Sequence, residues 1–215
     1  MLQTFGDAVQ VRDFDLADPR LLPLRSRDLL IHEGDPADLS LYLEDDLVIS
    51  DPLFLDKQAW FLDSTEGRLV LMPHRYERVN QSGAGVMLID GPLRADFIRR
   101  FHTPSEDQAS GSFDGRETIR FDVPANPHAG CFCLSRNQVE RLRGLPLAVE
   151  GFVDPLETAA TLTVLEHLTV VKPALPQWRF LCLEHAHPGF LGYLERYPIE
   201  PMPLRASPPA SGADP

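Results

Sequence analysis

Three consecutive carboxylates, Glu44, Asp45 and Asp46, follow directly on an apolar run at Leu39–Leu43. Residues 47–49 are apolar again, so the three side chains are held close to the core. Neighbouring negative charges repel one another, and burial strengthens that repulsion. Mg²⁺ or Mn²⁺ would relieve it, since such ions take oxygen ligands and need only one or two carboxylates beside water and substrate phosphate. The triplet therefore predicts a site for a divalent cation that in turn binds a diphosphate. The alternative interpretation is an acidic turn exposed to solvent.

Two further acids, Asp154 and Glu157, stand at the start of an expected helix, where Pro155 takes the first helical position. An acid in this place can act as a general base toward a hydroxyl group. The same spacing is typical of an N-terminal cap, with Asp154 as the cap and Glu157 completing a capping box. Both interpretations stay open from the sequence.

Basic and histidine side chains supply the remaining candidates. His128 precedes Gly130, and a glycine permits close approach of the backbone to a ligand. His185 and His187 lie on one face if the chain is extended there. Arg75 can place a guanidinium on a phosphate, or it can form a surface pair with Glu77 on one strand.

Capped helices alternating with apolar runs predict an α/β domain, a three-layer, mixed and mainly parallel sheet flanked by helices. In such sheets ligands bind at the carboxyl ends of strands, where the triplet lies. The expected strands are 8–16, Leu39–Leu43, Leu69–Met72, Val86–Asp90, Ile119–Val123, Thr169–Lys172 and Phe180–Glu184. The expected helices begin at Asp18, Asp51, Phe97, Ser135 and Asp154.

The pattern predicts a single domain over residues 1–197 with a polar, mobile loop at about 103–118. Residues 198–215 form a proline-rich tail that we expect to be disordered. A net charge of −12 argues against nucleic acid as a partner and against an anionic membrane surface. The three cysteines indicate neither a disulfide framework nor a structural zinc site. No leader or transmembrane run is apparent, so we expect a cytoplasmic protein, or one peripheral at the inner membrane face.

The apolar strand ending in Glu44-Asp45-Asp46 resembles the metal-binding "DXD" motif of GT-A-type glycosyltransferases, which use nucleotide-sugar donors. "YLEDDLVISDPLFLDKQAWF", "LVLMPHRYE", "NPHAGCFCLSRNQVERL" and "FVDPLETAAT" follow in order and resemble segments of uncharacterised bacterial members of that group. The resemblance covers about residues 36–190 and implies a GT-A-like fold.

What the resemblance implies for the site is specific. Asp46 would bind Mn²⁺ or Mg²⁺, Glu44 and Asp45 would support the metal or contact the donor ribose, and a late histidine, His185, would supply a third metal ligand. Glu157 would deprotonate the acceptor, with Asp154 beside it. The donor would be a UDP- or GDP-linked sugar and the acceptor a carbohydrate or a lipid-linked sugar. Bound metal would neutralise the leaving diphosphate beside an oxocarbenium-like transition state.

One departure from that pattern is the length of the front segment. Only 43 residues precede Glu44, so we expect an abbreviated nucleotide-binding half. Two other functions stay open: a non-catalytic glycosyltransferase-like binding module, and a metal-dependent hydrolase. The hydrolase would use the same carboxylates with His128, His185 and His187, a set that suits zinc.

Overall fold

Ten strands form three small sheets in the computed structural model, which describes residues 8–78 and 85–187. The first sheet pairs β1 (Leu39–Leu43) with β8 (Cys131–Ser135). The second has the order β2 (Leu47–Val48), β10 (Cys182–His185), β4 (His74–Arg78), β5 (Val86–Leu88). The third has the order β3 (Leu69–Leu71), β9 (Thr169–Pro173), β7 (Ile119–Val123), β6 (Ser105–Gly111). The molecule is thus a mixed α/β protein, as predicted.

The expectation of a mainly parallel sheet is wrong. Only β10–β4 and β3–β9 run parallel among the described strand pairs, and the others are antiparallel. A parallel pair needs a long crossover, whereas a short link such as 112–118 between β6 and β7 returns the chain antiparallel. Local patterns do not encode that choice of direction.

A bend at Met72-Pro73 joins the second and third sheets. The Met72 N–H donates to Val171 O (2.9 Å), and the His74 N–H donates to Leu181 O (3.1 Å). The parallel ladder therefore passes from β9 to β10 across Pro73, which has no N–H to contribute. This bend carries the second half of the strand, β4, to the end of β10, where the candidate histidine lies.

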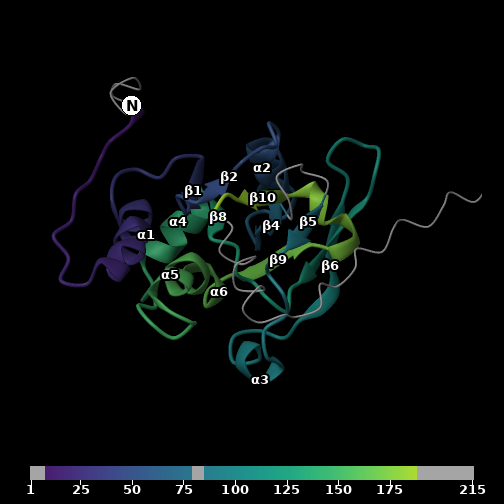
Figure 1. Ribbon diagram of the computed structural model, residues 1–215. Coiled ribbons are helices and arrows are strands. Elements are labelled where there is room, and N and C mark those ends of the chain that lie inside the picture. The colour runs from purple at the N-terminus through teal and green to yellow at the C-terminus, as the bar shows by residue number, and fades with distance from the viewer. Residues whose placement is uncertain (1–7, 79–84, 188–215) are drawn as a thin grey trace, which may run out of the picture.

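The helices cover two hydrophobic clusters. Asp18 caps a 3₁₀ turn (Pro19–Leu21) that leads into α1 (Leu22–His32), and a capping box between Ser135 and Gln138 begins α4 (Arg136–Arg143). The remaining elements are α2 (Phe54–Ser64), α3 (Ala95–Ile98), α5 (Pro155–Glu157), a π-helical turn (Thr158–Leu162), α6 (Thr163–Leu165) and a 3₁₀ segment (Leu175–Phe180). Figure 1 shows α1, α4, α5 and α6 gathered on one side, with α2 above β4 and β10.

Those helices bury two separate cores. Ile31, Phe132 and Ala160 belong to the cluster beneath α1, α4 and the 155–165 helix. Phe54 and Phe121 belong to the cluster between α2 and the sheet. The acidic triplet follows β1, whose strand lies between these two cores.

Two expected elements are absent or different. Residues 8–16 form no strand, and Val9, Val11 and Phe14 along them are exposed, because alternation alone supplies no partner strand. The expected loop at 103–118 instead contains β6, which pairs antiparallel with β7. Its polar composition reflects an exposed edge position rather than a lack of strand structure.

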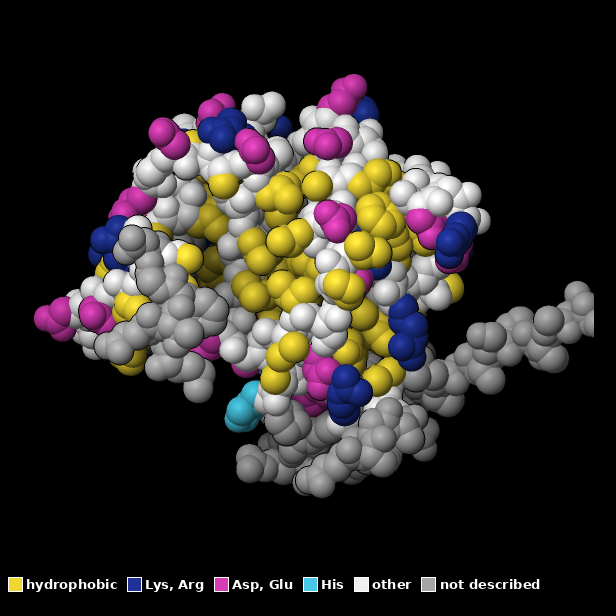
Figure 2. Space-filling model, turned by 90° about the horizontal axis from the view of Figure 1, so that it is seen from above, with side chains coloured by type: hydrophobic (Ala, Val, Ile, Leu, Met, Phe, Trp, Pro, Cys, Tyr) yellow, Lys and Arg dark blue, Asp and Glu magenta, His cyan; other side chains and the backbone are white. Residues whose placement is uncertain are grey.

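Hydrophobic side chains reach the surface on one face. Seen from above, they cover much of the middle of the molecule, with acidic side chains toward the rim (Figure 2). Leu43, Val48, Ile49, Leu53 and Leu55 are exposed and lie on or beside β1, β2 and α2, at the top in Figure 1. None of the helices in the described ranges is long and apolar enough to cross a membrane.

Candidate functional site: a cluster of buried carboxylates

The acidic triplet divides into three environments. Glu44 is only 9% exposed, and its N–H donates to Gly130 O at 3.0 Å as β1 ends. Asp45 is exposed in the turn. Asp46 is half-buried, and its carbonyl accepts a hydrogen bond from the Ala186 N–H (2.8 Å) just past β10. The solvated-turn interpretation therefore describes Asp45 but not Glu44.

His185 lies between two carboxylates. Its Nδ1 is 2.7 Å from Glu77 Oε1, and its Nε2 is 3.1 Å from Asp46 Oδ2. Glu77 is fully buried on β4. Both carboxylates accept hydrogen bonds, so Nδ1 donates its proton to a hydrogen bond with Glu77, and Nε2 can donate to Asp46 only when the ring carries a second proton. Two acceptors facing each other in this way require a proton or a cation between them.

A buried charge network stands beside Glu44. The Arg75 guanidinium donates to Asp90 Oδ1 through Nη2 (2.8 Å) and Nε (3.1 Å), and its Nη1 is 3.8 Å from Glu44 Oε2. Lys172 Nζ is 3.3 Å from Asp90 Oδ2 and donates to the His128 carbonyl at 2.6 Å. The alternative of a surface pair between Arg75 and Glu77 is wrong, because β4 is inside the sheet and each side chain has a buried partner elsewhere.

Burial and charge set the pKa values in this cluster. Burial raises the pKa of Glu44 to about 7; Asp46 and Glu157 add to the rise, and Arg75 opposes it. Burial acts in the same direction on the pKa of Asp90, but Lys172 and Arg75 outweigh it and hold that pKa well below its usual range. Asp90 is thus a fixed anion that neutralises the two cations. Little positive charge therefore remains to stabilise the negative form of the Glu44 carboxylate.

Gly130 allows this arrangement through its missing side chain. It has a φ of +60°, a left-handed conformation that L-residues rarely adopt. A Cβ at this position would overlap Glu44 Oε2 and lie 3.0 Å from Leu47 Cδ1. We expected Gly130 to permit a close approach to its backbone, and the group that makes this approach is the Glu44 carboxylate.

The interpretation of Asp154 as a helix cap is confirmed. Its Oδ1 accepts hydrogen bonds from the N–H groups of Leu156 (2.7 Å) and Glu157 (3.2 Å). Burial, together with the neighbouring Asp154 carboxylate, raises the pKa of Glu157 to about 7. Glu157 Oε2 is buried and has no hydrogen-bond partner among the described residues. Such an environment is typical of a carboxylate that exchanges protons near neutral pH.

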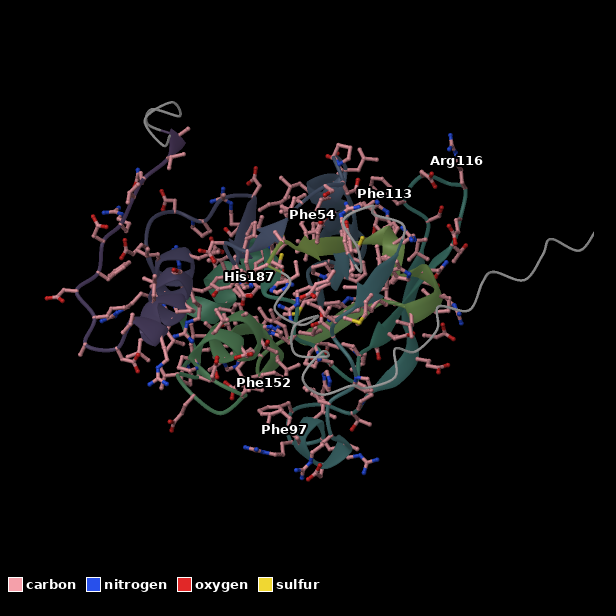
Figure 3. The ribbon with its side chains drawn as sticks, in the orientation of Figure 1. Phe54, Phe97, Phe113, Arg116, Phe152 and His187 are labelled. Atoms are coloured by element: carbon pink, nitrogen blue, oxygen red, sulfur yellow. The ribbon has the colours of Figure 1, made fainter. Side chains whose placement is uncertain are left out.

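His128 and His187 do not join these carboxylates as a ligand set. The His128 ring is buried, with Nδ1 2.9 Å from Thr161 Oγ1. Burial, with Arg75 and Lys172 nearby, lowers the pKa of His128 to about 3, so the ring is neutral. His187 is exposed at the end of the described chain (Figure 3). His128 contributes to the site through its backbone, whose carbonyl holds Lys172.

Three buried carboxylate oxygens have no hydrogen-bond partner within the described residues: Glu44 Oε1, Asp46 Oδ1 and Glu157 Oε2. No three His, Cys, Asp or Glu side chains in these ranges form a group able to hold a metal ion. Two ligands of an octahedral Mg²⁺ lie roughly 3.0 Å apart. The 3.1 Å separation of His185 Nε2 and Asp46 Oδ2 matches this spacing. The same distance is that of a hydrogen bond, so either a proton on Nε2 or a cation with further ligands from water would satisfy the pair.

Asp90, Lys172 and Glu77 are members of this cluster that sequence reasoning missed. Lys172 carried a usable signal, since a lysine inside the apolar run "TVVKP" requires a buried anion. Asp90 directly follows an expected strand, but no local feature identifies its partner. Glu77 resembled an ordinary outward-facing residue of a strand.

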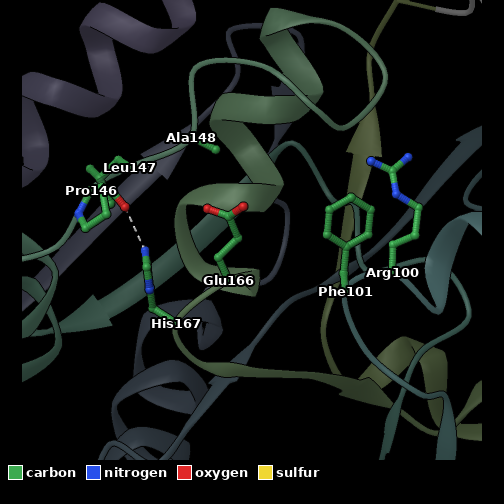
Figure 4. Close-up of a pocket in the computed structure, with 7 residues that line it drawn as sticks. All are labelled: Arg100, Phe101, Pro146, Leu147, Ala148, Glu166 and His167. Carbon is green, nitrogen blue, oxygen red and sulfur yellow. Dashed lines mark hydrogen bonds between the residues drawn. The ribbon is translucent and has the colours of Figure 1, made fainter.

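Neither of the two described cavities is lined by these carboxylates. One, of about 530 Å³, is lined by Arg100, Phe101, Pro146, Leu147, Ala148, Glu166 and His167. Figure 4 shows the Glu166 carboxylate between His167 and Phe101, with His167 Nε2 2.9 Å from Pro146 O. The other lies beside Trp60.

Comparison with protein-family models, with curated proteins and with solved structures finds no match to this chain. The interpretation of the site consequently depends on its own residues and on the motif resemblance.

Proposed function

We propose that the protein is a metal-dependent glycosyltransferase that moves a sugar from a nucleotide-sugar donor to an acceptor hydroxyl. The observation that carries the proposal is the set of three unpartnered, buried carboxylate oxygens on Glu44, Asp46 and Glu157. Burying such an oxygen without a partner costs about 1–3 kcal/mol, and a ligand that offers a cation and hydroxyl donors would recover that cost. A sugar diphosphate with its divalent ion offers both.

Asp46 and His185 would hold the cation, Mn²⁺ or Mg²⁺. The fixed orientation of His185 on Glu77 supports this assignment, as does the unpartnered Asp46 Oδ1. When bound, the metal supplies Lewis-acid neutralisation of the leaving diphosphate. The protein's contribution is to hold the imidazole and carboxylate in place before substrate arrives.

Glu157 is the proposed general base. A base is most effective when its pKa is near the working pH, and the pKa of about 7 for Glu157 meets that condition. The unpartnered Oε2 would accept the proton of the acceptor hydroxyl. Asp154 acts on Glu157 through the helix cap and through its charge.

The donor would occupy the space around Glu44, Arg75 and Gly130. Glu44 Oε1 suits a ribose or sugar hydroxyl, and Arg75 Nη1 adds positive charge near a phosphate. Asp45 is exposed beside them and would contact the donor or support the metal through water. In this proposal the chain is a GT-A-like enzyme that works in the cytoplasm or at the inner membrane face, on a carbohydrate or lipid-linked acceptor.

Calorimetric titration with UDP and with GDP, with Mn²⁺ present and with it chelated, tests the proposal. We expect binding only with Mn²⁺, abolished in Asp46→Asn and kept in Asp63→Asn, a matched change at an exposed aspartate on α2. Metal-independent binding, or none, would favour the non-catalytic module. If Asp46→Asn raised thermal stability and left nucleotide binding unchanged, the metal assignment would be wrong.

A further inference from the structure

A second cavity, of about 510 Å³, lies between the end of α2, the start of β3 and the edge strand β6. It shares no lining residue with the carboxylate cluster. Trp60 forms an aromatic wall, Ser64 and Arg68 supply polar side chains, and residues 108–112 line the cavity along β6. None of the described residues that line the cavity is an aspartate or glutamate.

Neighbouring aromatic rings hold the Trp60 indole in place. Its centroid is 5.7 Å from Phe113, 6.0 Å from Phe180 and 6.2 Å from Phe121, in edge-on or tilted arrangements. Figure 3 shows Phe113, which follows β6, beside α2. A ring fixed in this way presents apolar surface without loss of side-chain entropy when a ligand arrives.

Gly111 brings the backbone of β6 against the indole. A Cβ there would lie 3.0 Å from Trp60 Cζ2 and 3.2 Å from Cη2, tighter than ordinary packing. The glycine therefore lets the strand and the ring form two adjoining walls. Because side chains alternate along a strand, Ala109 and Gly111 face Trp60, whereas Gln108 and Ser110 face away from it, so β6 lines the cavity mainly with its backbone. The polar side chains of the lining come from Ser64 and Arg68, outside β6.

We propose that this cavity is a carbohydrate-binding site. A pyranose has an apolar C–H face, which packs on an aromatic ring, and a rim of hydroxyls, which pair with hydroxyl, amide and guanidinium side chains. Small-molecule sites generally combine apolar walls with a few placed polar groups in this way. Arg68 and the lack of lining carboxylates suit neutral and acidic sugars alike. The inference is independent of the proposed transferase activity, because no residue that lines this cavity belongs to the carboxylate cluster.

The test uses Trp60 as its own reporter. The chain has two tryptophans, so Trp178→Phe leaves the Trp60 fluorescence alone. This protein is titrated with cellobiose, N,N′-diacetylchitobiose, digalacturonic acid and uridine. Ser64→Phe, added to it, fills the cavity from an exposed position at the end of α2, and Leu55→Phe places the same side chain at an exposed position of the same helix outside the cavity.

We expect a saturable change in Trp60 fluorescence with at least one saccharide, at millimolar concentration. Ser64→Phe should weaken that binding by about tenfold or more, and Leu55→Phe should leave it unchanged. Thermal unfolding of each variant confirms that it is folded. Saccharide binding that survives Ser64→Phe, a response to uridine alone, or no response to any probe would overturn the proposal.

Discussion

Replacing His128 by glutamine should make the protein less sensitive to acid. The His128 ring is buried, and its pKa is lowered from 6.5 to about 3, mainly by burial. Below roughly pH 6.5 the unfolded chain therefore takes up a proton that the folded chain does not. The unfolding free energy must fall as the pH falls from 6.5 toward 3, and this group costs the folded state nothing above that window.

The magnitude follows from the two pKa values. At roughly pH 4.5 the unfolded state gains about 2.7 kcal/mol from protonating this single histidine, since each pH unit below its free pKa contributes about 1.36 kcal/mol. His128→Gln loses ring packing and so lowers stability at neutral pH. The difference in unfolding free energy between the wild type and His128→Gln should shrink by about 2–3 kcal/mol between pH 7.5 and 4.5, because the glutamine amide does not titrate.

Urea unfolding at a series of pH values, followed by circular dichroism, measures this difference directly. His32→Gln is the matched control, because His32 is exposed at the end of α1. Other acid-sensitive groups, such as His74, whose pKa burial lowers to about 4, remain in both proteins and cancel in the comparison. Parallel stability curves for the wild type and His128→Gln would refute the view that His128 is a neutral, buried ring.

Two other substitutions address the geometry at the carboxylates. Gly130→Ala should lower the unfolding free energy by about 3 kcal/mol, because the new side chain is strained at a left-handed φ and overlaps Glu44. Gly115→Ala is the control: Gly115 has a φ of +77° but lies in open space, so this change should lower the unfolding free energy by only about 1 kcal/mol. Equal losses in urea unfolding would contradict the overlap at Gly130. Glu157→Gln should reduce sugar transfer at least about 100-fold and leave metal-dependent nucleotide binding intact; full turnover would eliminate Glu157 as the base. Because the pKa of Glu157 is raised, the neutral glutamine should not lower stability.

Features set by neighbouring residues could be predicted from the sequence. The cap at Asp154, the capping box at Ser135 and the strand Leu39–Leu43 all depend on contacts within a few positions. The antiparallel pairing of β6 and the missing strand at residues 8–16 depend instead on which segments meet in space. Alternation of apolar residues describes a surface that could be buried, but it does not name the strand that covers it.

The same division applies to the site. Glu44, Asp46, Glu157 and His185 are candidates from the sequence because residues of these types at this spacing could carry chemistry. The long-range contacts of the cluster were missed. Arg75 meets Asp90 across 15 positions of the sequence, Lys172 meets Asp90 across 82, and His185 meets Glu77 across 108. Only folding brings these groups together, so a sequence shows at most that a buried charge needs some partner.

Stability alone does not account for the carboxylate cluster. Glu44 could be replaced by glutamine without change of shape, which would remove a buried charge whose pKa is already raised to about 7. Asp46 and His185 meet at 3.1 Å, a contact that requires either a proton on Nε2 or a cation. Gly130 makes room for the Glu44 carboxylate, but a glycine loses more backbone entropy on folding than any other residue. The unpartnered oxygens of Glu44, Asp46 and Glu157 each weaken the folded state, and in the proposed function one ligand with positive charge and hydroxyl donors would relieve them together. That convergence is the physical reason to look for a metal-bound sugar nucleotide here before any purely structural role.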